Sequence, residues 1–135
     1  MTMETLYIHT NNKEKLSAIE KLCESLKITV KEIRNSDLNR TVLDIVASVP
    51  IMFNNKTNIN GGTVSKVPPL FLMPEVILFN GFNDESLQGF LAAYRKAGIE
   101  KVALKAVVTP YNITWTLYDL IEHLKEESAQ DPGNR

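Results

Sequence analysis

The sequence predicts an α/β fold in which two βαβα half-repeats form a small mixed or mostly parallel sheet with helices packed on it. Three observations lead to this prediction. Short apolar runs alternate with longer segments whose apolar residues recur every three or four positions. The order strand, helix, strand, helix occurs twice along the chain. The composition, 44% apolar and 23% charged over 135 residues, is typical of one globular domain with a real core.

The second half shows this order most clearly. Val76–Phe79 is a wholly apolar run, as expected of a strand that is covered on both faces. Asn83 then begins a helix that Gly98 ends, and Val102–Val108 is a second run rich in β-branched residues. The buried faces of this helix and of the last helix are predicted from helical spacing: Leu87, Phe90, Leu91, Tyr94, Leu117, Leu120, Ile121 and Leu124.

The first half repeats the order with more polar residues. Leu6–Ile8 is a brief strand, and Asn11 or Asn12 can cap the helix that follows. Thr29–Arg34 is a polar strand, and Asp37 precedes a short helix. The first helix is expected to bury Leu16, Ile19, Leu22, Cys23 and Leu26. Its charged residues are expected to be exposed: Glu14, Lys15, Glu20, Lys21 and Glu24.

The two halves align with each other, which predicts an internal duplication. Leu6 falls on Ile77 at an offset of 71, whereas Val42 falls on Leu117 at an offset of 75. We therefore expect four extra residues in the second half, at about Thr109–Thr114. An enlarged loop favours a functional role, although drift produces the same difference.

A single domain is expected to span residues 1–135. It comprises a half-repeat at 1–46, a connector at 47–73, a half-repeat at 74–126 and a frayed tail at 127–135. The least charged strands are expected at the centre of the sheet, and the polar strand of the first half at one edge. The connector or a second copy of the chain would cover the opposite edge, so we expect a monomer or a weak homodimer.

Charge and composition exclude several classes of partner. Fifteen basic and sixteen acidic residues give a net charge of -1, without the basic face that nucleic acids or anionic membranes require. No signal peptide and no membrane span is recognised, so the expected location is cytoplasmic. Cys23 lies on the apolar side of a predicted helix, which favours a core residue over a reactive one.

One stretch resembles a known family. The run LKAVVTPYNITWTLYDLIEHLKEE, with PEVILFNGF ahead of it, is similar to the bacterial domain-of-unknown-function family 3783. Its most specific feature is the Thr-x-x-Asn-x-x-Trp pattern at Thr109, Asn112 and Trp115. The LYIHTN opening and the LKITVKEI strand resemble the region that usually accompanies that domain. The resemblance implies no established activity.

The sequence shows no recognisable catalytic set. His9 and His123 lie far apart with no second His or Cys at ligand spacing, which favours ordinary surface roles over a metal site. We therefore expect no catalytic residues, no metal and no cofactor, and we leave open whether the protein is an enzyme.

Lys105 is the one charged residue inside the apolar run Val102–Val108. A buried lysine is costly unless it is paired or neutral, and such residues are over-represented at functional sites. In the alternative interpretation the strand lies near an edge and the long side chain reaches water.

The segment from Thr109 to Trp115 is the other candidate. It would leave the carboxyl end of a strand and enter the amino end of a helix, where an anion or a polar ligand is favoured. Tyr111 and Trp115 could supply flat apolar walls beside Asn112. In the alternative, Asn112 or Thr114 only caps the last helix and Trp115 anchors it.

Two functions remain open. The first is a non-catalytic module that binds an unknown small molecule or protein through the loop from Thr109 to Trp115. The second is a small enzyme that uses Lys105 with Asn112 or Thr109. The lack of an acid/base pair favours the first. The deciding geometry is whether Lys105 and Asn112 converge at the start of the last helix. A Lys105 side chain that leads out to bulk water on the far side of the sheet from Trp115 would leave only a cap.

Overall fold

The computed structural model describes residues 4–47, 67, 68 and 70–130. Its elements are β1 (Thr5–His9), α1 (Lys13–Ser25), β2 (Thr29–Glu32), a 3₁₀ turn (Asn35–Asp37), α2 (Val42–Ala47), β3 (Val76–Asn80), α4 (Asp84–Lys96), β4 (Leu104–Val107) and α5 (Leu117–Gln130). Most of the predicted connector 47–73 lies outside the described residues. The predicted tail begins inside α5, and only its last five positions, 131–135, lie outside them.

The four strands form one mixed sheet in the order β2-β1-β3-β4. β1 and β2 are parallel, β3 and β4 are parallel, and the two pairs meet where β1 runs antiparallel to β3. The predicted α/β class is confirmed, with β1 and β3 at the centre and the polar strand β2 at an edge. β4 is the other edge.

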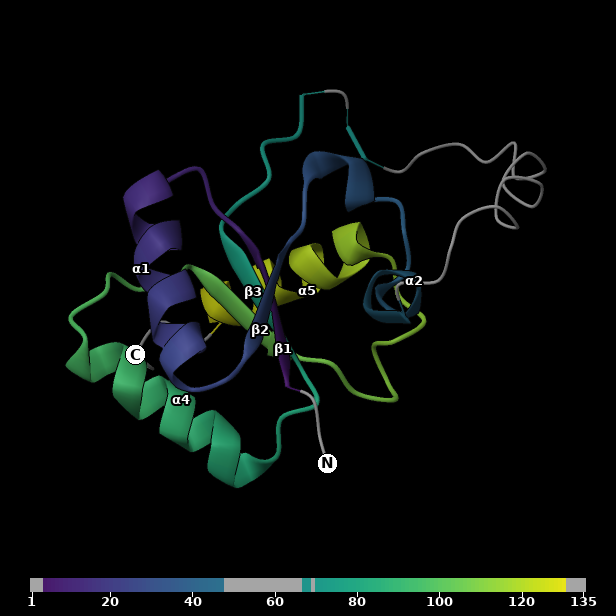
Figure 1. Cartoon of the computed structure of the whole chain (residues 1–135). Coiled ribbons are helices and arrows are strands. Elements are labelled where there is room, and N and C mark those ends of the chain that lie inside the picture. Colours follow the sequence, from purple (N-terminus) through teal and green to yellow (C-terminus); the bar gives the residue numbers. More distant parts are fainter. Residues whose placement is uncertain (1–3, 48–66, 69, 131–135) are drawn as a thin grey trace.

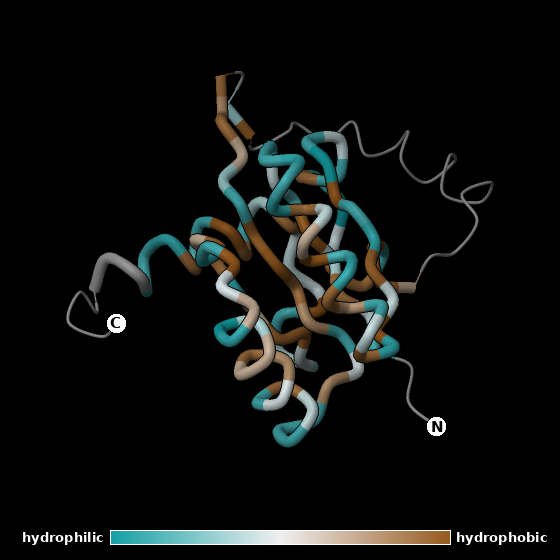
Figure 2. Tube along the Cα trace, turned by 60° about the vertical axis from the view of Figure 1, so that its left-hand side comes forward, coloured by the Kyte–Doolittle hydropathy of each residue, from teal (hydrophilic) through white to brown (hydrophobic). Residues whose placement is uncertain are grey.

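Helices cover both faces of the sheet, α1 and α4 on one side and α2 and α5 on the other (Figure 1). Alternation along the strands divides the core accordingly, because successive side chains point to opposite faces. Leu6, Ile8, Ile77 and Phe79 are buried on the α1/α4 face, and Tyr7 and Leu78 on the α2/α5 face. Figure 2 shows hydrophobic residues along the central strands and hydrophilic ones at helix ends and loops. No helix in the described ranges is long and apolar enough to cross a bilayer.

The helices α1 and α4 begin and end in the same way. The side-chain oxygen of Asn12 accepts the Lys15 N–H at 3.0 Å, and that of Asn83 accepts the Ser86 N–H at 2.7 Å. Each helix is followed by a residue of positive φ, Lys27 at 63° after α1 and Gly98 at 74° after α4. Gly98 stops α4 as predicted, because a left-handed backbone ends a helix and suits glycine.

The caps of α2 and α5 are threonines, which corrects one prediction. In the first turn of α5, the Asp119 N–H donates to Thr116 Oγ1 at 3.1 Å. The cap of α5 is therefore Thr116, and neither of the predicted residues Asn112 and Thr114. Thr41 Oγ1 does the same for α2. The prediction was wrong because Asn112 and Thr114 are also good capping residues, and the sequence does not show how far the loop continues before the helix begins.

The two threonines also join the halves of the protein. Thr41 and Thr116 form an isolated antiparallel bridge. Four main-chain hydrogen bonds of 2.8 to 3.0 Å surround this bridge and form two pairs. In the first pair, the Val42 N–H donates to the Trp115 carbonyl and the Leu117 N–H donates to the Arg40 carbonyl. In the second pair, the Leu43 N–H donates to the Ile113 carbonyl and the Tyr118 N–H donates to the Leu38 carbonyl. Within each pair, the two donors are 75 positions apart in sequence, and so are the two acceptors. Common ancestry of the two halves stays a prediction.

The strand pairing shows where the second half is longer. Thr5 pairs with Thr29, and Val76, which corresponds to Thr5 at the offset of 71, pairs with Leu104. Leu104 therefore corresponds to Thr29, and these two residues are 75 positions apart, so the offset of 75 already applies at the start of β4. The four extra residues therefore lie between α4 and β4, at 100–103, and the prediction that placed them at Thr109–Thr114 was wrong. The apolar Val102 extends the run of β4 in sequence and so concealed the longer connection.

Lys15 contradicts its predicted exposure. Its exposed fraction is 8%, the Nζ atom lies 2.7 Å from Glu75 Oε1, and it also donates to the Lys101 carbonyl at 3.0 Å. The helical pattern could not show this, because both partners are distant in sequence and lie close only in the folded chain.

Candidate functional site

The loop from Thr109 to Trp115 is closed by its own polar groups. Asn112 Oδ1 accepts the Thr109 N–H at 3.0 Å, and Asn112 Nδ2 donates to the Val107 carbonyl at 3.1 Å. Thr109 Oγ1 accepts the N–H groups of Tyr111 and Asn112, both at 3.2 Å. The groups of Asn112 and Thr109 that were expected to face a ligand therefore hold the loop together.

The first half contains the same turn. Asp37 Oδ2 accepts the Arg34 N–H at 2.9 Å, and these residues correspond to Asn112 and Thr109 at the offset of 75. The turn is thus a shared structural device of the two halves, and it does not distinguish the second half.

The two aromatic residues of the loop have different surroundings. Trp115 is half-buried against the core of the α2/α5 face, with its ring 5.1 Å from that of His123. Tyr111 is 84% exposed. Trp115 thus anchors α5, and Tyr111 remains accessible. A binding role for this loop stays a prediction.

Lys105 and Trp115 do not come together. Lys105 is paired in register with Ile77 and shares with Val107 the face that α1 and α4 cover, whereas Trp115 packs on the opposite face. The sheet thus separates the two residues, and no site that combines them is formed. As in the alternative interpretation, β4 is an edge strand and Lys105 is exposed to water, and its side chain also lines a cavity on its own face.

This α4–β4 cavity has a volume of about 480 Å³ and lies between α4, β3, β4 and the connection before β4. Ligand cavities in proteins usually measure about 300 to 1,000 Å³. Its walls are mostly apolar: Ile77, Phe90, Leu91, Ile99 and Val102. Two of its lining residues, Lys101 and Val102, belong to the four extra residues of the second half. The longer connection therefore helps to form the cavity.

Three cations line the same cavity, Arg95, Lys101 and Lys105. Across the described part of the chain, no acidic side chain forms an ion pair with any of them. Burial, and to a smaller degree the charge of Lys101, lowers the pKa of the Lys105 ammonium below its ordinary value. The cavity thus combines an apolar interior with positive charge that the described residues leave without a counterion.

The sequence indicated only one of these three residues. Arg95 lies at the carboxyl end of a helix, where the helix dipole favours a cation, so its presence there did not indicate a binding site. Lys101 lies among the four extra residues of the second half. It would have been noticed if the alignment of the two halves had placed the insertion at 100–103.

Comparison with known proteins identifies the half of the chain that contains the α4–β4 cavity. Residues 75–130 match the family model described as Domain of unknown function (DUF3783). The matched segment is referred to below as the DUF3783 domain. No curated protein and no solved structure matches the chain. The matched residues include β3, α4, β4 and α5 in full, and every residue that lines the α4–β4 cavity. The cavity therefore belongs to the DUF3783 domain.

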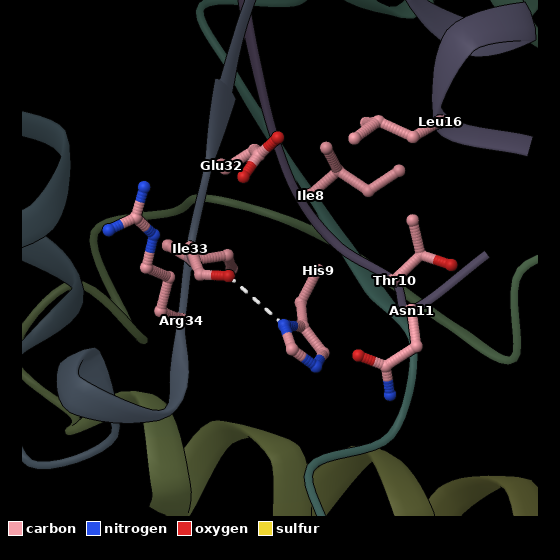
Figure 3. A pocket seen from close by; sticks show the side chains of 8 residues that line it. All are labelled: Ile8, His9, Thr10, Asn11, Leu16, Glu32, Ile33 and Arg34. Atoms are coloured by element: carbon pink, nitrogen blue, oxygen red, sulfur yellow. Dashed lines mark hydrogen bonds between the residues drawn. The ribbon is translucent and has the colours of Figure 1, made fainter. Parts of the chain in front are cut away.

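A smaller cavity of about 190 Å³ lies outside the DUF3783 domain, at the carboxyl ends of β1 and β2 (Figure 3). His9 Nδ1 lies 3.1 Å from the Ile33 carbonyl, which can only accept, so Nδ1 carries the hydrogen. Arg34 extends away from the imidazole (Figure 3). Among the described residues no three His, Cys, Asp or Glu side chains are grouped to hold a metal ion. Glu32 also lines this His9 cavity, so an imidazole and a carboxylate border it.

The Lys15–Glu75 ion pair lies between the two cavities. Glu75 Oε2 accepts from Thr10 Oγ1 at 2.6 Å, and Thr10 lines the His9 cavity, while Lys15 contacts the Lys101 carbonyl on the other side. Burial raises the pKa of the Glu75 carboxyl, but hydrogen bonds from Lys15 and Thr10 and the charges of Lys15 and His9 outweigh it and lower the pKa overall. Glu75 is therefore held in its ionised form.

Cys23 is fully buried, as predicted for a core residue. Burial, with a contribution from the charge of Glu20, raises the pKa of its thiol to about 12. The thiolate needed for nucleophilic or redox chemistry is thus strongly disfavoured.

Proposed function

We propose that this protein is a binding module whose DUF3783 domain holds a small molecule with an apolar body and an anionic group in the α4–β4 cavity. The observation that carries this proposal is the charge of the cavity. Arg95, Lys101 and Lys105 line a mostly apolar space, and no described acid pairs with them. An anionic group would supply the missing counterion, while the apolar body would fill the interior.

The lining residues also support binding over catalysis. They include no Asp, Glu, His or Cys, and the hydroxyl of Tyr94 donates to the Glu100 carbonyl. Burial and the charges of Glu75 and Glu100 raise the pKa of Tyr94 to about 12, so it is a poor partner for acid–base chemistry near neutral pH. The loop from Thr109 to Trp115 offers an alternative, a contact with a protein partner at the exposed Tyr111. The cavity is the stronger candidate because its size and charge together specify a chemical class of ligand.

Matched probes test the proposal by calorimetric titration of the full-length protein. Phenylpropionate and phenylpropanol share an apolar body and differ in the carboxylate. We expect the carboxylate to bind about tenfold more tightly, since a charge-assisted contact contributes about 1.4 kcal/mol. Added salt should reduce the difference, because the rim is open to water.

Two variants locate the binding. Lys105→Met should weaken the binding of phenylpropionate toward that of the alcohol, because it removes one of the three cations that attract the carboxylate. Lys21→Met is the matched control, since Lys21 is an exposed lysine of α1 that does not line the cavity. Equal binding of the two probes, or equal loss in both variants, would refute the proposal. Retained affinity in Lys105→Met together with loss in Tyr111→Ala would favour the loop instead.

A further inference from the structure

The position of Lys105 in the cavity carries a second inference, which rests on the proposed function and deepens it. We propose that Lys105 captures an α-oxo acid with an apolar side chain by forming a reversible imine with its carbonyl carbon. The ligand class follows from the arrangement of the cavity, in which an amine, two further cations and apolar walls face one space.

The fold does not require an amine at this position. In the first half the residue that corresponds to Lys105 in the strand pairing is Val30, which packs against the core of the same face. A valine therefore satisfies the same place in the sheet. The second half departs from this in two neighbouring places, with a lysine in β4 and with the longer connection that brings Lys101 to the cavity.

The surroundings favour the reactive form of the amine. A lysine attacks a carbonyl only when it is neutral, and desolvation or a neighbouring cation activates it by disfavouring the ammonium. Lys105 has both in part, since this exposed residue lines a mostly apolar cavity, and partial burial together with the charge of Lys101 lowers its pKa. No described carboxylate pairs with Lys105 and stabilises the charged form.

The remaining cations fit the rest of the ligand. Arg95 and Lys101 can hold the carboxylate of an oxo acid, while Phe90 and Leu91 contact its apolar side chain. An uncharged aldehyde would leave these cations without a counterion. An oxo acid thus matches more of the cavity than a simple carbonyl compound does.

The chemical step is balanced without any further reactant. The amine nitrogen of Lys105 attacks the carbonyl carbon and forms a C–N bond. The carbonyl oxygen then leaves as water together with both hydrogens of the amine, and a C=N double bond remains. Hydrolysis of the imine returns the free ligand, so the capture is reversible.

The test is chemical trapping on the full-length protein. The protein is incubated with phenylpyruvate and sodium cyanoborohydride, and the modified lysines are located by peptide mass spectrometry. We expect Lys105 to be modified at least about fivefold faster than Lys21 or Lys96, which are exposed and do not line the cavity. Excess phenylpropionate, which lacks the carbonyl group, should protect Lys105 alone.

Comparison of lysines within one sample needs no variant, so the result does not depend on the folding of a mutant. Lys105→Arg adds a second measurement, because a guanidinium cannot form the imine and the fast adduct should be abolished, while phenylpropionate binding is measured on the wild type. Equal modification of all three lysines, with phenylpropionate still bound, would overturn the imine and leave the proposed function intact. Failure of phenylpropionate to bind would overturn both.

Discussion

The two halves of the protein share the structure that holds the fold together and differ where they form cavities. Both halves use the same asparagine caps, the same turn after the second strand and the same threonine caps at the joint between them. They differ at β4, where Lys105 stands in place of Val30 and the preceding connection is longer. The cavity that carries the proposed function thus lies where the two halves differ, whereas the turn in Thr109–Trp115 lies where they agree.

A second difference lies at the ends of the central strands. After β3, Phe82 packs on Phe79 and Phe90, with ring centroids 5.2 and 6.3 Å away. After β1, the corresponding residue is Asn11, which lines the His9 cavity. One end is therefore closed by an aromatic cluster and the other is open. The open end also carries the ion pair of Lys15 and Glu75. At the offset of 71 the corresponding residues at the closed end are Ser86 and Glu4, which are not a pair of opposite charges.

The largest difference in stability is expected between the two glutamates that precede the central strands. Glu75→Gln leaves the buried Lys15 with only the exposed Glu100 carboxylate, 3.9 Å away, and should lower the free energy of unfolding by about 2 to 4 kcal/mol. Glu4→Gln, the corresponding change in the first half, should cost less than about 0.5 kcal/mol, since it removes no ion pair given by the structure. Urea unfolding at neutral pH measures both.

The pH dependence of the same pair provides a control. The pKa of Glu75 is lower in the folded than in the unfolded state, so its contribution is complete above the ordinary glutamate pKa. This contribution is lost as the pH falls through the lowered value, and the gap between wild type and Glu75→Gln should then close. A gap that persists in acid would show that the cost of the variant has another origin.

An intermediate effect is expected from exchanging the residues that close and open the strand ends. Phe82→Asn removes an aromatic ring from its cluster and should destabilise the protein by about 1.5 to 3 kcal/mol. Asn11→Phe should change stability by less than about 1 kcal/mol, because the new ring can occupy the His9 cavity. Thermal unfolding followed by circular dichroism measures both. A large loss from Asn11→Phe would indicate that the cavity cannot accommodate an aromatic ring.

A small gain in stability is expected from a change at Lys105 itself. Lys105→Val restores the residue of the first half and should raise the free energy of unfolding by less than about 1 kcal/mol, because water screens a group this exposed. The pKa of Lys105 is lowered by folding, so wild type gains stability as the pH rises through that pKa toward the ordinary lysine value. The advantage of the variant should therefore shrink in alkali. Denaturant titrations at neutral and alkaline pH measure this, and an advantage that grows with pH would contradict it.

Local patterns in the sequence predicted most of the fold, because strands and amphipathic helices depend on near neighbours. The caps Asn12 and Asn83, the stop at Gly98 and the central position of β1 and β3 follow from such patterns. The candidate site was only partly predictable. Lys105 was recognised from its charge, and strand alternation correctly places it on the face of Val107, but the helices that cover this face are set by tertiary structure.

The burial of Lys15 was beyond the reach of local patterns for a different reason. A charged residue at the edge of a helical stripe reads as exposed unless a partner is known, and Glu75 is placed beside it only by the antiparallel pairing of β1 with β3. The same holds for the α4–β4 cavity, since Arg95 and Lys105 come from different elements. Residues that meet through tertiary structure leave no periodic signal.

The pairing of β1 with β3 has a consequence for synthesis of the chain on the ribosome. Thr5 at the start of β1 pairs with Asn80, and translation at roughly 5 to 20 residues per second reaches that partner on the order of 4 to 15 s later. During this time β1 exposes one unpaired apolar edge, and unpaired edges favour association between chains. The polar strand β2 blunts the outer edge of the nascent sheet, so the inner edge is the one exposed until the DUF3783 domain has been made.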